Sequence, residues 1–182
     1  MLFLVPARLH PQKNPLGVIE AMETVLKKKP ACPARIAFAG KGKAEEEAKA
    51  HAADSAHPEA FRFLGQRDDM LALYNAADAV VLSSFKEGFS NAVVEALACG
   101  KPVIASDVGG NREAINERRF GWIHDAGDTQ ALAGQLTEAC EIGRKGLTAM
   151  AADCRARAEC FSVEELVRQT DILYRKALEG RT

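Results

Sequence analysis

Glu87 and Glu95 are the residues of this sequence whose chemistry most needs an explanation. They belong to the stretch EGFSNAVVEALACG at 87–100, in which no other residue is charged. Glu95 stands in an apolar run, and a glutamate is seldom fully buried unless it is paired. A buried carboxylate at this position could accept hydrogen bonds from two vicinal hydroxyls, as on a ribose. Glu87, at the entrance of the same predicted helix, could do the same for another sugar.

Two cations and a helix start could bind the phosphates that link two such sugars. Arg8 and Lys13 are five residues apart in RLHPQKNP. Gly88 allows close backbone approach, Ser90 or Asn91 suits a helix cap, and free N–H groups at a helix start attract anions. Taken separately, the cations fit solvated surface charges and the helix start fits a simple turn. Together they predict a diphosphate clamp, because charge-assisted hydrogen bonds are the strong kind.

These groups can meet only if the elements that carry them end at one place. Apolar runs predict strands at 2–7, 35–40, 61–65, 79–84, 102–106 and 121–125. Helices are predicted at 14–29, 43–53, 68–77, around Glu95 and at 111–116, the first with Asn14 as cap and Pro15 at its first position. The alternation predicts an α/β fold with a parallel sheet of about six strands and helices on both faces.

In such sheets ligands bind beyond the carboxyl ends of the strands. Unusual residues follow most of the predicted strands: Arg8 after the first, Gly40, Lys41 and Gly42 after the second, Gly65, Gln66 and Arg67 after the third, Glu87 to Asn91 after the fourth, and 107–110 after the fifth. Any one of these segments could be an ordinary turn. Their joint placement at one edge predicts a ligand site.

Composition excludes several other classes of protein. The chain has 182 residues and a formal net charge of -1, which suits one α/β domain and gives no electrostatic case for nucleic acid. No apolar run is long enough to span a membrane, and no signal peptide is recognisable. Five cysteines without a CxxC pair indicate free thiols in a reducing cytosol. The four histidines lack metal-site spacing.

The final stretch, SVEELVRQTDILYRKALEG at 162–180, predicts a helix. Ser162 and Glu165 have the spacing of a capping box, and Gly180 is a suitable stop. An apolar stripe runs along the helix and consists of Val163, Leu166, Val167, Leu173, Tyr174 and Ala177. We expect the stripe to pack on the core of this domain; a surface for a partner, including a second copy of the chain, is the alternative.

The motifs together resemble a known family. EGFSNAVVEALACGKPVIASDVGG contains an E-x7-E pattern, and ARLHPQKN, FAGKGK and FLGQRDDMLALYNAADAVVLSS precede it in order. With these motifs the chain resembles the C-terminal, donor-binding domain of a retaining GT-B glycosyltransferase of family 4, the group 1 glycosyl transferases. The resemblance extends from about residue 2 to about residue 140. It implies a Rossmann-like domain over residues 1–182, with C-terminal helices from about 145.

The resemblance implies a role for each predicted site residue. Arg8 and Lys13 would hold the diphosphate of a UDP- or GDP-linked sugar and stabilise charge on the leaving group. Glu87 would contact the donor sugar and Glu95 the ribose. The implied catalytic residues are thus Arg8, Lys13 and Glu87, and the implied donor-binding residues are Gly40, Gly42, Gln66, Arg67, Gly88, Phe89, Ser90, Asn91 and Glu95. The scheme requires neither a metal nor a cofactor, and no Asp-x-Asp motif is present.

The family has two domains with the active site between them, and this chain resembles only the second. The resemblance therefore implies that an N-terminal acceptor-binding domain is missing and that the isolated chain is inert. The expected partners are the nucleotide-sugar and the missing domain, and a homodimer is a further alternative. The expected location is the cytoplasm, where the full-length protein could reach the inner membrane face through its missing domain.

Rival functions fit the sequence less well. A nicotinamide or flavin domain requires G-x-G-x-x-G after the first strand, where this chain has PARLHPQ, and no P-loop motif occurs. A GT-B nucleotide-sugar epimerase would need a different set of acids and bases. A nucleotide-sugar-binding module without turnover remains the alternative from a different class.

Overall fold

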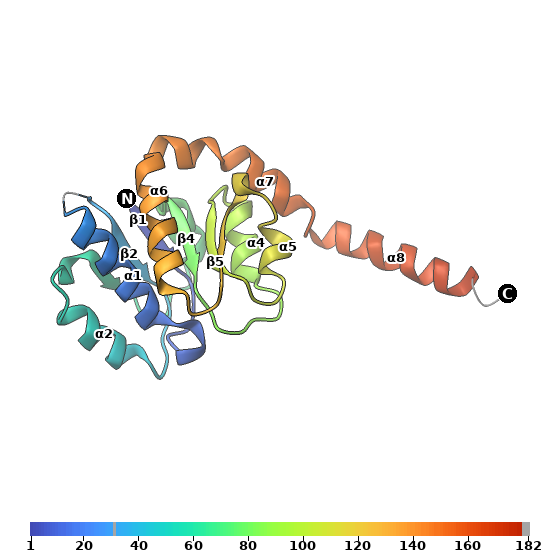
Figure 1. Ribbon diagram of the computed structural model, residues 1–182. Coiled ribbons are helices and arrows are strands. Elements are labelled where there is room, and N and C mark those ends of the chain that lie inside the picture. Colours follow the sequence, from blue (N-terminus) through green and yellow to red (C-terminus); the bar gives the residue numbers. More distant parts are fainter. Residues whose placement is uncertain (31, 180–182) are drawn as a thin grey trace.

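The computed structural model describes residues 1–30 and 32–179. Within them a parallel sheet is covered by helices on both faces (Figure 1). The strands are β1 (Leu2–Val5), β2 (Arg35–Phe38), β3 (Phe61–Phe63), β4 (Ala79–Leu82), β5 (Val103–Ser106) and β6 (Gly121–His124). The helices are α1 (Pro15–Lys28), α2 (Glu45–Ala53), α3 (Met70–Ala76), α4 (Asn91–Ala98), α5 (Asn111–Ala114), α6 (Thr129–Ala149), α7 (Ala151–Glu159) and α8 (Val163–Glu179). Short 3-10 turns lie at Pro11–Lys13, Pro58–Ala60 and Arg118–Phe120.

The order of the strands confirms the predicted fold class. Among the described residues the sheet has six strands in the order β3-β2-β1-β4-β5-β6. Every neighbouring pair is parallel, with Leu4 of β1 opposite Ala37 of β2 and Val80 of β4. The chain therefore starts in the middle of the sheet, moves to one edge, and returns to build the other half. The carboxyl ends of β1 and β4, where the order reverses, lie side by side.

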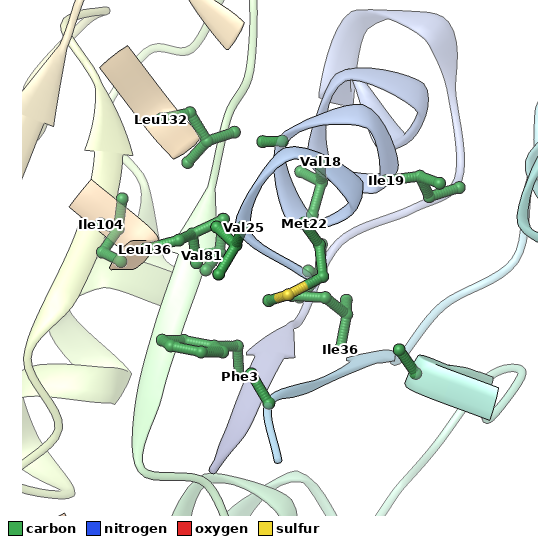
Figure 2. Packing of buried hydrophobic residues seen from close by; sticks show 14 of the residues in the cluster. Phe3, Val18, Ile19, Met22, Val25, Ile36, Val81, Ile104, Leu132 and Leu136 are labelled. Atoms are coloured by element: carbon green, nitrogen blue, oxygen red, sulfur yellow. The ribbon is translucent and has the colours of Figure 1, made fainter. Parts of the chain in front are cut away.

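Successive side chains of each strand point to opposite faces of the sheet, where they pack in two separate cores. Phe3 of β1 packs on one face with residues of α1, α2 and α6, and Figure 2 shows it in one cluster with Met22 and Leu136. Leu4, the next residue, packs on the other face with residues of α3, α4 and α7. A parallel strand covered on both faces needs an unbroken apolar run. This requirement explains why the strands could be predicted from short apolar segments.

The first helix begins where the sequence predicts. Asn14 is its N-cap, with the side-chain oxygen accepting a hydrogen bond from the Gly17 N–H at 3.2 Å, and Pro15 occupies the first helical position. Asn14 has a φ of 53°, in the left-handed region. Asparagine tolerates this region better than most residues, so the loop from β1 can turn sharply into α1.

The helical stretch after β6 begins earlier than the expected residue 145. It starts with α6 at Thr129, which packs against α1, and the backbone of α6 bends at Gly143, where φ is 70°. α7 follows and packs against α4, placing Cys154 in the second core. α6 therefore covers one face of the sheet and α7 covers the other.

α8 corrects the expectation for the apolar stripe. The helix leaves the body of the domain (Figure 1) and has no buried residue. Five stripe residues, Val163, Leu166, Val167, Leu173 and Tyr174, are 62% to 71% exposed, so the prediction that the stripe packs on this domain's core is wrong. The predicted cap is confirmed in part, since Ser162 Oγ accepts a hydrogen bond from the Glu165 N–H at 3.2 Å. Gly180, the predicted stop, lies outside the described residues.

The five cysteines are free thiols in this structure. In the part of the chain that the structure describes, no helix has the length and apolar character that a membrane crossing demands.

Candidate active site

The loops after β1, β2 and β4 are joined at the carboxyl edge of the sheet. The Leu9 N–H donates to the Lys41 carbonyl oxygen at 3.1 Å, which joins the first loop to the second. Gln12 bonds to the loop after β4 twice, accepting from the Phe85 N–H at its carbonyl and donating from Nε2 to the Lys86 carbonyl, both at 2.8 Å. The segment that carries Arg8 and Lys13 is thus held against the segment that carries Glu87.

Two glycines make the contact between the first two loops possible. A Cβ on Gly40 would lie 2.1 Å from the carbonyl oxygen of Ala7, and one on Gly42 would lie 2.2 Å from that of Leu9. No side chain fits at such distances, so the glycines of GKG are explained by close packing of backbone on backbone. Gly40 also borders a cavity, whereas Gly42 acts through this packing.

A cavity of about 470 Å³ opens at this edge, between β1, β2 and the start of α3 and α4. Its lining includes five of the predicted residues: Arg8, Gly40, Gln66, Arg67 and Glu95. Lys41, which follows the second strand as the sequence predicts, also lines the cavity, together with Met70, Tyr74 and Ala92, which were not singled out from the sequence. Residues that are distant in the chain therefore converge where the reversal of strand order favours a ligand.

Glu95 is paired with a tyrosine. Its Oε2 accepts a hydrogen bond of 2.7 Å from the hydroxyl of Tyr74, which is itself buried. Burial, and next the hydrogen bond to Glu95, raise the pKa of Tyr74, so its hydroxyl stays protonated and donates. Glu95 as a whole is exposed, contrary to the expectation of a buried carboxylate. In the described part of the chain its Oε1 has no hydrogen-bond partner and remains able to accept from a ligand.

Glu87 is held by two groups. Its Oε1 lies 2.5 Å from Lys13 Nζ and accepts a hydrogen bond of 2.6 Å from Ser84 Oγ. The side chains of Lys13 and Glu87 are only 19% and 12% exposed, so solvent screens this ion pair weakly. Lys13 was predicted to face a phosphate, and in this structure it faces Glu87. An ammonium group has several N–H donors, so it can bind a carboxylate and a phosphate together.

The two arginines of the site differ in their surroundings. Arg8 is exposed, and its guanidinium has no ion-pair partner among residues 1–30 and 32–179. Arg67 makes two hydrogen bonds to the Asp69 carboxylate, at 2.8 and 2.7 Å. This bond to Asp69, with its charge, raises the pKa of Arg67. Arg8 is therefore free to bind an anion in the cavity, whereas the guanidinium of Arg67 already binds Asp69.

The loop before α4 is pressed against the turn after β5. The Gly110 N–H donates to the Gly88 carbonyl oxygen at 2.8 Å, and the Phe89 ring lies 5.3 Å from the Phe161 ring. Ser90 is the N-cap of α4 by position, but its side chain makes no capping hydrogen bond. The first turn of α4 thus lacks a side-chain cap. The Val93 N–H donates to the Ser90 carbonyl oxygen at 3.0 Å, which leaves the N–H groups before it available to an anion.

Part of the predicted donor site lies outside the cavity of Glu95. Phe89 and Asn91 line a separate groove of about 390 Å³ with residues of the α7–α8 junction. Lys13, Glu87, Gly88 and Ser90 belong to the same edge of the sheet but line neither space. Across the described ranges, no group of three or more His, Cys, Asp or Glu is placed to hold a metal ion.

A Rossmann-like sheet with a cavity at the reversal of its strand order occurs in GT-B glycosyltransferase domains, as in other doubly wound folds. The model of the family "Glycosyl transferases group 1" matches residues 1–159. This match covers most of the chain, which therefore belongs to the group 1 glycosyl transferases.

Named relatives agree with this assignment. The chain is 31% identical to the D-inositol 3-phosphate glycosyltransferase of Corynebacterium urealyticum, over 92% of this chain and 41% of the relative. It is 32% identical to the putative glycosyltransferase EpsD of Bacillus subtilis, over 75% of this chain and 35% of the relative. The chain thus spans about two fifths of the length of such curated relatives.

Solved structures show the same fold. Anabaena Alr3699/HepE in complex with UDP is similar at a TM-score of 0.82 and 25% identity, over 96% of this chain and 48% of that one. A glycosyltransferase from Rickettsia africae is similar in fold at a TM-score of 0.84 and 23% identity, over 97% and 48%. This chain matches about half of each.

Proposed function

We propose that this chain is the donor-binding domain of a retaining glycosyltransferase that takes its sugar from a nucleoside-diphosphate sugar. The observation that carries the proposal is the hydrogen bonding of the two carboxylates. Each of Glu87 and Glu95 has one oxygen held by protein groups, while its other oxygen accepts no hydrogen bond from the described residues. Carboxylates anchored in this way are pre-oriented to accept hydrogen bonds from sugar hydroxyls.

The donor would lie along the carboxyl edge of the sheet. The nucleoside occupies the cavity beside Gln66 and Arg67, with the ribose hydroxyls on Glu95. The diphosphate passes between Arg8, Lys13 and the uncapped start of α4, and the sugar reaches Glu87. The UDP in Anabaena HepE, a relative in fold at 25% identity, supports a nucleoside diphosphate as the common ligand. A GDP-linked sugar, with guanine as its base, remains the alternative donor.

The chemistry would depend on the leaving diphosphate. The bond from the anomeric carbon to the phosphate oxygen breaks, and the acceptor oxygen bonds to the same face of that carbon. The acceptor's proton passes to the leaving phosphate oxygen. Arg8 and Lys13 stabilise the negative charge that grows on the diphosphate during this step. Two cationic side chains here take the part of a divalent ion, so the proposal requires no metal.

Calorimetry on the 182-residue chain tests the proposal. We expect UDP or GDP to bind more tightly than uridine or guanosine, and we call this ratio of dissociation constants the diphosphate increment. Arg8→Ala should lower this ratio by a factor that corresponds to about 1.5–3 kcal/mol, the scale of a hydrogen bond to a charged group. Equal binding of nucleoside and nucleotide by the unmodified chain would defeat the proposed function.

The two glutamates should separate in their effects. Glu95→Gln is expected to weaken binding of nucleotide and nucleotide-sugar alike, because it weakens the ribose contact and the bond to Tyr74. Glu87→Gln should leave nucleotide binding nearly unchanged and lower turnover of the two-domain enzyme, because Glu87 acts on the sugar. Titration of both ligands into both variants checks this, and equal losses of UDP affinity would show that the roles are misassigned.

We also propose that the isolated chain is catalytically inert, because it spans only about two fifths of the length of the curated relatives that it matches. Positioning of the acceptor contributes several kcal/mol to such reactions. A radiolabelled sugar-transfer assay should detect donor binding without transfer. Transfer by this chain at the rate of a two-domain relative would contradict the proposal of a half-enzyme.

A further inference from the structure

A buried histidine lies beneath the proposed site without a part in the chemistry described so far. His124 is the last residue of β6 and is 5% exposed. Its Nδ1 lies 3.0 Å from Gln135 Oε1 of α6, and its Nε2 lies 3.4 Å from Ser83 Oγ, just after β4. Buried polar groups are costly unless each finds a partner, so the surrounding bonds determine the state of the ring.

The other side-chain hydrogen bond of Gln135 determines which atom donates and which accepts in each bond to His124. Gln135 Nε2 donates to the Ile123 carbonyl at 2.8 Å, so Gln135 Oε1 is the acceptor that faces His124. Nδ1 of His124 therefore carries the proton, and Nε2 accepts from the hydroxyl of Ser83. Ser83 Oγ in turn accepts from Asn14 Nδ2 at 3.3 Å, and Asn14 Oδ1 accepts from the Gly17 N–H.

The chain of bonds ends beside Lys13. Asn14 is the next residue, holds the left-handed turn into α1, and closes the 3-10 turn that contains Lys13. The orientation of the Lys13 side chain toward Glu87 depends on this turn. Ser84, which follows Ser83, holds Glu87 itself. The two consecutive serines thus connect to the two ends of the Lys13–Glu87 pair.

We propose that His124 is a positioning residue for the diphosphate subsite, because its neutral imidazole holds Lys13 in place through Ser83 and Asn14. This inference rests on the proposed function, since it assigns Lys13 to the diphosphate. Only the accepting form of Nε2 completes the chain. A protonated ring would present a second N–H to Ser83 Oγ, which already accepts from Asn14, and the buried Ser83 hydroxyl would lose the acceptor of its own proton.

The surroundings favour the neutral ring. Burial lowers the pKa of His124; Gln135, Asp128 and Asp125 oppose this effect without overcoming it. The unfolded chain therefore binds the proton at a higher pH than the native chain. The free energy of unfolding should fall as the pH drops below the ordinary range of histidine. The diphosphate increment should fall only at still lower pH, where the native ring itself takes up the proton and the chain of bonds to Asn14 breaks.

Two neutral substitutions separate positioning from packing. In His124→Gln the amide oxygen can reach the place of Nε2 and accept from Ser83. In His124→Asn the amide nitrogen can take the place of Nδ1 and donate to Gln135, leaving Ser83 without its acceptor. We expect His124→Asn to lower the diphosphate increment roughly three- to tenfold, toward the level of Lys13→Ala. His124→Gln should restore most of it and should flatten its pH dependence between pH 5 and 7.5.

Calorimetry with UDP and uridine, and with GDP and guanosine, measures the increment for each variant. Affinity for the nucleoside should stay the same in both, because Lys13 does not contact it. Protonation of the nucleotide's own phosphate affects every variant equally and cancels in the comparison. Equal losses in the two variants, or no loss in either, would overturn the proposal.

Ser83→Ala provides an independent test if His124→Asn does not fold. It removes the hydroxyl between His124 and Asn14 and leaves the histidine in place. It should lower the increment as His124→Asn does, and an unchanged increment would overturn the inference. An unmodified chain without any increment would instead defeat the proposed function, which distinguishes the two failures.

Discussion

Lys13→Ala is expected to weaken binding of the nucleoside diphosphate by about 3 kcal/mol, the upper end of the range expected for Arg8→Ala. The substitution does two things at once. It removes a cation from the proposed diphosphate subsite, and it leaves the carboxylate of Glu87, whose side chain is 12% exposed, with Ser84 as its only described partner. An uncompensated negative charge then faces the phosphates. Arg8, which has no such carboxylate beside it, lacks the second effect.

The double variant Lys13→Ala/Glu87→Gln separates these two contributions. Removing the charge of Glu87 should recover part of the lost affinity for UDP, although Glu87→Gln by itself is expected to change that affinity little. Calorimetry on the four proteins of this cycle measures the coupling between the two residues. If the double variant binds UDP as weakly as Lys13→Ala, the repulsion is absent and the pair does not face the diphosphate.

Gly109→Ala should lower the free energy of unfolding by about 3 kcal/mol or more. Gly109 has a φ of 54°, in the left-handed region, and an added Cβ would lie 1.8 Å from the carbonyl oxygen of Gly88. Because the obstacle is backbone, it can move only by displacing the loop that begins α4. The same substitution should therefore weaken diphosphate binding in whatever fraction of the protein still folds.

Gly134→Ala is the matched control for this prediction. Gly134 lies within α6 and is exposed, and beyond its chain neighbours and the nearby backbone of its own helix an added Cβ would have no atom within 4 Å. Alanine is preferred to glycine inside a helix by up to about 1 kcal/mol, so this variant should be as stable as the parent or more stable. Urea denaturation of both variants checks the contrast. Equal stability of the two would mean that the turn after β5 adapts without strain.

The elements that the sequence predicted well are those with local signals. Each strand is a short apolar run, since both faces of the sheet are covered, and Asn14–Pro15 marks the start of α1 through cap geometry alone. α6 was missed because Gly134, Gly143 and Gly146 interrupt its apolar pattern. A helix that is stabilised by packing against α1 can tolerate such glycines. The sequence alone does not indicate that this packing exists.

The site was predicted less completely because its contacts join distant parts of the chain. Lys13 and Glu87 are 74 positions apart, and neither sequence segment shows that they form an ion pair. In the sequence, the pattern around Tyr74 indicates a core residue of a helix. Only the packing of α3 beside α4 brings its hydroxyl to Glu95. The residue types predicted the ligand class, whereas the fold decides which protein group holds each carboxylate.

The apolar stripe of α8 shows that an amphipathic pattern does not predict which surface covers a helix. An amphipathic pattern says that a helix has one apolar face, and the pattern is the same whatever covers that face. Val163 and Tyr174 would show identical spacing in a helix packed on its own core. Where α8 leaves the body of the domain therefore depends on the end of α7 and on the capping residue Ser162, not on the stripe.

A helix without buried side chains also has consequences for how the molecule behaves over time. The 17 residues of α8 draw no stability from the two cores, and a helix of this length is only marginally stable in water. Its backbone amides should exchange their hydrogens with deuterated solvent far faster than those of α1. A protease would then find its first accessible bonds beyond Phe161, and brief digestion should trim the molecule to a resistant body that ends near the last residue of α7.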